Sequence, residues 1–321
     1  MTARARERDL RRSWLIVVAL PLLGACSPSR GRPEDRGTPQ ARVVRGSPSR
    51  CAPLADAGAA VLRFAVIGDY GDGSSNEAEV ARMVTAWRPD FIITVGDNNY
   101  PAGEAATIDA HIGQYFHAFI APYAGLYGAG ADRNRFFPSL GNHDLLTDGG
   151  APYLEYFVLP GNERYYDVAW GNVHLFALDS DPSEPEGVTE DSVQGAWLQA
   201  RLQAATERFR IVYMHHPPYS SGPHGSTSYM QWPFRRWGAN LVLSGHDHAY
   251  ERLEVEGQVY IVCGLGGAPE YTFGDPKTGS EVRYVSHHGA GLVEVGADLL
   301  RFRFQAVNGA VIDDFCLMAG P

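Results

Sequence analysis

The sequence lacks any apolar run long enough to span a membrane. A transmembrane helix needs about 18 or more consecutive apolar residues, and no segment of the 321-residue chain reaches that length. This absence excludes a polytopic membrane protein. Hydrophobic residues nevertheless make up 45% of the chain, which is enough for a sizeable core and excludes general disorder.

Basic residues are in deficit. The chain has 27 Lys and Arg against 37 Asp and Glu, and its formal net charge is −10. Nucleic acids are held chiefly by clustered Lys and Arg side chains. The charge balance therefore predicts that no nucleic acid is a partner.

Cysteine is scarce, with four residues and no CxxC pair, which argues against a thiolate zinc site. In an oxidising compartment, a bridge between Cys51 and Cys316 would tie the N-terminal segment to the final expected strand. Cys263 follows the apolar run 259–262 and is expected to be a small buried side chain.

Residues 1–25 are predicted to be an export signal. A head rich in arginine precedes the apolar run 14–20, and Leu23-Gly24-Ala25-Cys26 resembles a bacterial lipobox in which Cys26 would be lipidated. An ordinary cleavage site with an incidental cysteine is the alternative. Arg11-Arg12 also resembles a twin-Arg signal, which exports folded proteins. We therefore expect an exported protein, lipid-anchored on the periplasmic or cell-envelope side of a bacterial membrane.

Residues 26–60 are rich in Pro, Arg, Ser, Gly and Ala without hydrophobic periodicity, so they are predicted to be a flexible tether. The remainder, 61–321, is predicted to be one α/β domain built around packed sheets. Strands and helices alternate first and strands then dominate. The expected helices are 77–87 and 193–205, and the expected strands are 61–67, 91–95, 173–178, 210–214, 240–243, 258–263, 291–295, 299–306 and 311–317.

Five polar clusters each follow an apolar run. Ligands of open α/β sheets bind beyond the carboxyl ends of the strands, and a glycine lets the backbone turn so that its neighbour points into a common cavity. The clusters are Gly68-Asp69-Tyr70-Gly71, Gly96-Asp97-Asn98-Asn99-Tyr100, Gly141-Asn142-His143-Asp144, His215-His216-Pro217 and Gly245-His246-Asp247-His248. Their oxygen and imidazole donors suit iron, zinc or manganese. Two such ions sharing a carboxylate lie about 3.5–4 Å apart, activate water and clamp a phosphoryl group.

These clusters resemble those of the purple acid phosphatases, a branch of the calcineurin-like metallophosphoesterase superfamily, from about Val61 to the end of the chain. The resemblance implies an α/β/β/α sandwich of two packed mixed sheets flanked by helices, with 61–321 as the catalytic domain. It also implies hydrolysis of phosphate monoesters by in-line attack of a metal-bound hydroxide. A phosphodiesterase or nucleotidase of the same superfamily is the alternative, and a non-catalytic surface lipoprotein is a third hypothesis.

The resemblance also implies seven metal ligands in two sets. The set for the first ion is Asp69, Asp97, Tyr100 and His248. The second ion would share Asp97 and be held further by Asn142, His215 and His246.

Tyr100 bears on the identity of the first ion. A free phenol has a pKa near 10, so its binding as phenolate requires a strongly polarising cation. The first ion is therefore expected to be Fe(III), and the second Fe(II), zinc or manganese. The alternative is that Tyr100 only packs in its loop and both ions are divalent.

Two other histidines are candidates for contact with a small phosphoester substrate. The resemblance places His143 beside the phosphate, where it could donate a hydrogen bond or protonate the leaving alcohol. His224 is the second candidate for general acid, and an exposed loop histidine is its alternative role. His287 and His288 are expected at the surface or rim. The sequence leaves the oligomeric state open.

Overall fold

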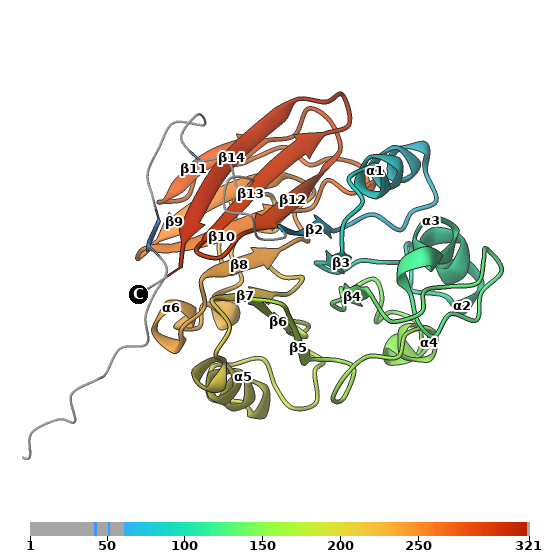
Figure 1. The fold of residues 1–321 in the computed structure, drawn as a ribbon, viewed down its shortest axis with the longest axis horizontal. Helices are drawn as coiled ribbons and strands as arrows, with labels where there is room; N and C mark the ends of the chain where they lie inside the picture. The colour runs from blue at the N-terminus through green and yellow to red at the C-terminus, as the bar shows by residue number, and fades with distance from the viewer. Residues whose placement is uncertain (1–41, 44–50, 52–60, 320–321) are drawn as a thin grey trace, which may run out of the picture. The chain divides into compact units, whose positions relative to one another are not determined.

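The computed structural model describes residues 42–43, 51 and 61–319, whose strands form two seven-stranded sheets (Figure 1). The predicted export signal, Cys26 and nearly all of the predicted tether lie outside these residues.

The first sheet has the strand order β1-β14-β13-β12-β2-β3-β4. Neighbours β2, β3 and β4 are parallel, and the other neighbours are antiparallel. The strands are β1 (Arg42–Val43), β2 (Leu62–Ile67), β3 (Phe91–Thr94), β4 (Phe136–Pro138), β12 (Gly289–Val295), β13 (Leu299–Ala306) and β14 (Val311–Met318).

The second sheet has the order β11-β9-β10-β8-β7-β6-β5. Strands β10, β8, β7 and β6 are mutually parallel, while β11, β9 and β5 join antiparallel. The strands are β5 (Tyr166–Trp170), β6 (Val173–Ala177), β7 (Phe209–Tyr213), β8 (Leu241–Ser244), β9 (Tyr250–Val255), β10 (Gln258–Cys263) and β11 (Ser280–Tyr284).

Two helices of 12 residues each, α1 and α5, begin at serine caps. Ser74 accepts a hydrogen bond from the Glu77 amide, and Ser192 accepts one from the Gly195 amide. The α-helices are α1 (Ser75–Ala86), α2 (Ala105–Ile108), α3 (Gln114–Phe116), α4 (Ala151–Tyr156), α5 (Val193–Ala204) and α6 (Phe234–Trp237). Short helical turns are η2 (Asp109–Gly113), η3 (His117–Phe119), η4 (Asp148–Gly150) and η5 (Ser228–Met230).

The core lies between the sheets and beneath the helices. In β7, Ile211 belongs to the main hydrophobic cluster, which also contains Phe64 and Phe302 of the first sheet. Its neighbour Val212 belongs to a second cluster with Leu198 of α5. Because successive strand residues face opposite sides, β7 is buried on both faces. The predicted α/β/β/α sandwich is confirmed (Figure 1).

The expected strands and both expected helices occur, with ends displaced by at most two residues. Strands β1, β4, β5, β9 and β11 were not predicted, and β1 lies within the predicted tether. Strand β9 contains the charged residues Glu251, Arg252 and Glu254, yet it lies between β10 and β11. Its neighbours in the sheet, rather than an apolar pattern, make it a strand.

The Cys51–Cys316 disulfide, which the sequence left as a possibility, is present, with a Cα–Cα distance of 5.9 Å and a separation of 265 residues. Cys263 is a buried free thiol, as expected. Within the described residues, no helix has the length and apolar character needed to cross a membrane.

Candidate metal centre

The five polar clusters meet at one edge of the sandwich because each follows a strand end. Asp69 lies two residues after β2, and Asp97 and Tyr100 lie in the loop after β3. The remaining candidate ligands, Asn142, His215, His246 and His248, follow β4, β7 and β8.

The first candidate set is tightly grouped. The Tyr100 hydroxyl donates to Oδ2 of Asp97 at 2.8 Å and lies 3.1 Å from Nε2 of His248. Nε2 of His248 is 3.5 Å from Oδ1 of Asp69. Asp69, Asp97 and His248 each offer a ligand atom, and these atoms lie within 4.8 Å of one another.

The second candidate set joins the first through Asp97. Nε2 of His215 lies 3.4 Å from Oδ2 of Asp97 and 3.0 Å from Oδ1 of Asn142. Nδ1 of His246 is 3.1 Å from the same His215 nitrogen. The structure thus brings all seven predicted side chains together, with Asp97 between the two sets.

Two imidazoles are oriented by backbone carbonyls. Nδ1 of His215 lies 2.9 Å from the Val95 carbonyl oxygen, and Nδ1 of His248 lies 2.7 Å from that of Pro269. A proton on Nδ1 leaves the lone pair on Nε2, which faces the other candidate ligands. This arrangement is typical of histidines that bind metal ions.

Three candidate ligands have a left-handed backbone. The φ angles are 55° at Asp69, 51° at Asp97 and 69° at His246. Such angles are uncommon in residues other than glycine and concentrate at functional sites. The surrounding structure holds these backbones; Oδ1 of Asp97, for example, accepts the His143 amide at 2.9 Å.

The glycines of the clusters permit close approach. A Cβ on Gly141 would lie 2.2 Å from the Asp97 amide nitrogen, and one on Gly245 would lie 2.5 Å from Oδ2 of Asp69. Only glycine fits at either position without displacing the neighbouring aspartate.

Asp144 joins two of these clusters. Its buried carboxylate accepts hydrogen bonds from the Asn98 amide at 3.0 Å, the Asn98 side chain at 2.8 Å and the Gly141 amide at 2.9 Å. It therefore fixes the loop after β3 against the loop after β4.

The electrostatics favour a cation among these groups. Burial raises the pKa of Asp69 well above its ordinary value, and His215 offsets only part of this effect. Burial would also raise the pKa of Asp97, but the nearby His215 has the larger effect and lowers the pKa of that carboxyl below its ordinary value. Burial would lower the pKa of His215, but Asp97 raises it to about 10. A positive charge at this position therefore stabilises the ionised Asp97 carboxylate.

Two other side chains are held neutral. Burial, and then the charges of Asp69 and Asp97, raise the pKa of Tyr100 far above its usual range. Burial, and then the charge of His215, lower the pKa of His246 to about 2. Neutral His246 can offer a lone pair, whereas Tyr100 would become a phenolate only beside a strongly polarising cation.

The two candidate substrate histidines lie on different sides of the centre. The His143 ring is tilted on Tyr100 with centroids 4.5 Å apart, and its Nδ1 is 2.6 Å from the Pro101 carbonyl oxygen. The exposed His224 ring lies 4.3 Å from the His246 ring. His216 contacts Ser180 through Nδ1 at 3.0 Å instead of joining either set.

The expectation for His288 was wrong. Only 6% of His288 is exposed, and its ring contacts Glu270 and the Ala268 carbonyl oxygen. His287 is exposed as expected. Sequence reasoning also missed Tyr271, whose ring stacks on His248 at 4.0 Å with an interplanar angle of 7°. Nothing in the local pattern marks Tyr271, because it lies in a loop 23 residues beyond His248.

A two-sheet α/β sandwich with a cluster of carboxylates and imidazoles at its strand ends is typical of hydrolases of the phosphoesterase type. The chain matches the calcineurin-like phosphoesterase family over residues 62–250, a span that includes all seven candidate ligands. The chain belongs to this family.

The similar proteins include acid phosphatases. Human tartrate-resistant acid phosphatase type 5 is 27% identical over 251 residues, covering 66% of this chain and 75% of the relative. Purple acid phosphatase 17 of Arabidopsis thaliana is 27% identical over 231 residues, covering 61% of this chain and 64% of the relative. These relatives support phosphoesterase activity.

Solved structures share the fold. Purple acid phosphatase PPD1 from yellow lupin superposes with a TM-score of 0.64 at 16% identity, covering 80% of this chain and 54% of that one. GAP50, described as the anchor in the inner membrane complex of Plasmodium, has a TM-score of 0.64 at 19% identity. The match covers 82% of this chain and 90% of GAP50.

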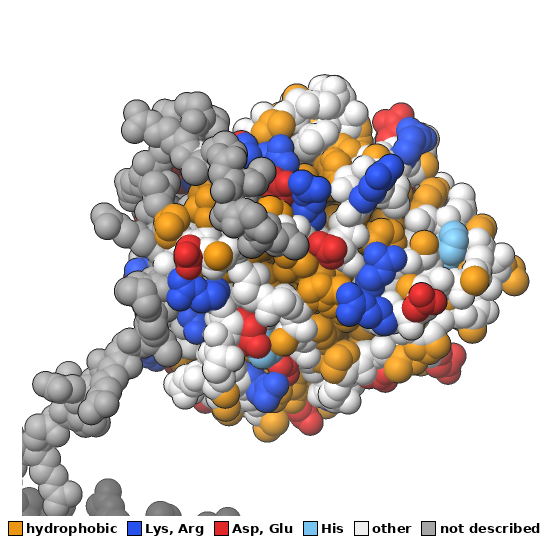
Figure 2. Space-filling model, in the orientation of Figure 1, with side chains coloured by type: hydrophobic (Ala, Val, Ile, Leu, Met, Phe, Trp, Pro, Cys, Tyr) orange, Lys and Arg blue, Asp and Glu red, His pale blue; other side chains and the backbone are white. Residues whose placement is uncertain are grey.

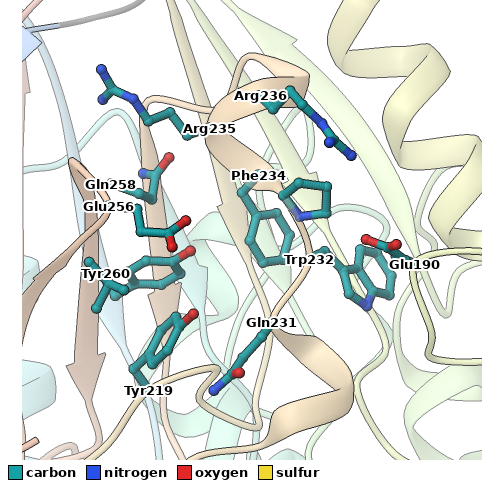
Figure 3. Close-up of a pocket in the computed structure, with 12 residues that line it drawn as sticks. Glu190, Tyr219, Gln231, Trp232, Phe234, Arg235, Arg236, Glu256, Gln258 and Tyr260 are labelled. Carbon is teal, nitrogen blue, oxygen red and sulfur yellow. The ribbon is translucent and has the colours of Figure 1, made fainter. Parts of the chain in front are cut away.

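A separate pocket of about 530 Å³ lies between α6 and the β9–β10 turn (Figure 3). Tyr219, Glu256 and Tyr260 form one side of it, and Phe234 and Trp232 face them. None of the seven candidate ligands lines this pocket. On the face in Figure 2, basic side chains occur singly or in small groups among acidic and apolar ones.

Proposed function

We propose that this chain is a dinuclear, metal-dependent acid phosphatase that hydrolyses phosphate monoesters. The observation that carries the proposal is the convergence of seven side chains in two sets that share Asp97. The similarity to tartrate-resistant and purple acid phosphatases supports the same activity.

The donor chemistry fits two metal ions. Tyr100, Asp69, Asp97 and His248 would hold Fe(III), since a phenol with a raised pKa ionises only beside a strongly polarising cation. Asp97, Asn142, His215 and His246 would hold Fe(II), zinc or manganese. When bound, such a pair activates water for in-line attack and neutralises charge on the phosphoryl oxygens.

The chain's own residues would orient the ester and supply a proton. His143 is positioned by the hydrogen bond from its amide to Asp97 and is half exposed, so its ring can donate to a phosphoryl oxygen. His224 is exposed beside His246 and would protonate the leaving alcohol oxygen.

We further propose that the protein is exported and anchored through a lipid on Cys26. The Cys51–Cys316 disulfide supports export, because such bonds persist in oxidising compartments. The lipobox-like residues 23–26 support the anchor.

The proposal is tested by assaying the full chain, loaded with iron and zinc, on a monoester, a diester and a nucleotide from pH 4 to 8, together with metal analysis. We expect two ions per chain and a kcat/KM at least about tenfold higher for the monoester. Faster hydrolysis of the diester would favour the phosphodiesterase alternative. Full activity with fewer than two ions would contradict the dinuclear centre.

A non-catalytic surface protein is a second candidate, since GAP50 shares the fold and is described as an anchor. Metal titration coupled to hydrolysis separates the two. Tight metal binding without turnover of any ester would favour the anchor.

A further inference from the structure

Two buried carboxylates lie beneath the loop that carries His224. Asp247 accepts the His224 amide at 3.0 Å and the Ser220 hydroxyl at 2.5 Å. Glu251 accepts the Ser221 amide at 2.7 Å and the Ser221 hydroxyl at 2.6 Å. Both carboxylates belong to residues with no exposed surface, so water does not compete for these bonds.

Glu251 also reaches a second loop, the one that carries Tyr271. Its Oε1 accepts the Ser280 hydroxyl at 2.6 Å. Ser221 reinforces the connection, because its hydroxyl accepts the Lys277 amide and its carbonyl accepts the Gly274 amide, each at 2.9 Å. The loops 220–225 and 271–280 are therefore joined through one buried carboxylate and one serine.

The joined loops place two rings against the candidate ligands. His224 lies 4.3 Å from His246, and Tyr271 lies 4.0 Å from His248. The two rings also contact each other at 5.4 Å in an edge-to-face arrangement. Displacement of Ser221 would therefore move His224 relative to the centre.

Glu251 itself is well fixed. It is the second residue of β9, where it pairs with Val262 of β10 and Arg283 of β11. A carboxylate on a strand bonded on both sides is a rigid support for a loop.

We propose that Glu251 is a positioning residue of the reaction, which holds His224 at the leaving-group side of the site by fixing Ser221. The inference rests on the proposed function, in which His224 protonates the leaving alcohol. Proton transfer depends on the distance and direction between acid and leaving oxygen, so a small displacement of His224 slows the reaction.

The test is Glu251→Gln, which preserves size but replaces an acceptor oxygen with a donor group. For an alkyl phosphate such as glycerol phosphate, we expect kcat/KM to fall by up to about 100-fold. For p-nitrophenyl phosphate we expect a loss below about threefold, because a weakly basic leaving group needs little protonation. An equal loss on both esters would overturn the proposal.

A double-mutant cycle shows whether Glu251 acts through His224. If it does, Glu251→Gln combined with His224→Ala is no slower on the alkyl ester than His224→Ala alone. Independent, multiplying losses would overturn the proposal, and so would full turnover by His224→Ala. A wild-type chain that hydrolyses neither ester would instead refute the proposed function.

Amide hydrogen exchange in the metal-free chain gives a readout apart from activity. We expect faster exchange at Ser221, Gly274 and Lys277 in Glu251→Gln, with β10 unchanged, and unchanged loop exchange would overturn the proposal. Ser221→Ala, which removes only the hydroxyl contacts, serves if Glu251→Gln does not fold. The matched control is Asp313→Asn, which weakens hydrogen bonds to Tyr250 and Arg252 of β9 and contacts neither loop. This variant should leave the ratio of kcat/KM for the two esters unchanged.

Discussion

The proposed identity of the first metal ion rests on Tyr100. Its hydroxyl lies between Asp97 and His248, and burial with the two nearby carboxylates raises its pKa. A phenolate held in such a place requires a strongly polarising partner, and ferric iron meets that requirement better than a divalent ion.

Tyr100→Phe is expected to remove a visible absorption band of the iron-loaded protein, since the band requires a phenolate bound to ferric iron. The measurement is the visible spectrum together with iron content per chain. Tyr219→Phe, in the pocket of Figure 3, should keep the band. A colourless, iron-free and fully active wild-type protein would contradict the assignment of Fe(III).

Asn142→Ala is expected to empty the second site. The amide oxygen of Asn142 faces Nε2 of His215 at 3.0 Å, so its removal deletes one of four donors. We expect metal content to fall from two ions to one and turnover to fall by more than about 100-fold. His117→Ala, which removes contacts with the Gly113 carbonyl oxygen and the Tyr123 ring but with none of the candidate ligands, is the control. Retained turnover in Asn142→Ala with its metal content checked would refute the assignment.

At the scale of elements, a partly buried ion cluster joins β5, β6 and the segment just before β7. Nε2 of His174 lies 2.6 Å from Asp167, and its Nδ1 lies 2.8 Å from Glu207. Burial opposes the charge on His174, but the bonds to these two carboxylates prevail and raise its pKa. Arg201 of α5 also binds Asp167, so the cluster extends to the outer helix.

The raised pKa of His174 determines how its contribution to the free energy of unfolding changes with pH. Protonated His174 stabilises the folded chain below its unfolded pKa of about 6.5, and this stabilisation is lost as pH rises through the higher folded value. His174→Gln should therefore lower the free energy of unfolding by about 1 kcal/mol more at pH 5.5 than at pH 9. Urea unfolding of both proteins at both pH values measures the difference, and a larger cost at pH 9 would reverse the argument.

At the scale of the whole molecule, the Cys51–Cys316 disulfide closes a loop of 265 residues that contains the whole second sheet and most of the first. A cross-link over so long a loop reduces the freedom of the unfolded chain. Cys316 lies on β14, so the bond fixes Cys51 to the first sheet.

Replacing both cysteines with serine should lower the free energy of unfolding by about 2–4 kcal/mol. Denaturant unfolding with and without a reductant measures the effect. The reductant should destabilise the wild-type chain and leave the double variant unchanged. Equal responses of the two proteins would show that the bond does not stabilise the folded state.

The sequence by itself determined where most strands lie along the chain and which residues are the candidate ligands. Strands β10 and β13 have the bounds predicted, because continuous apolar runs and strict alternation are local signals. The candidate ligands were found for the same reason, since each cluster directly follows such a run and its glycine marks the turn.

Only the tertiary structure decided which groups touch. The His246 amide bonds Asp69, 177 residues away, and His215 contacts the Val95 carbonyl oxygen across 120 residues. Nothing in the local sequence marks Glu251, yet it is fully buried and bonds Ser221 and Ser280. Such distances and burial follow from the packing of the two sheets and their loops, which no local pattern encodes, because the partners of a side chain are set by segments remote in the chain.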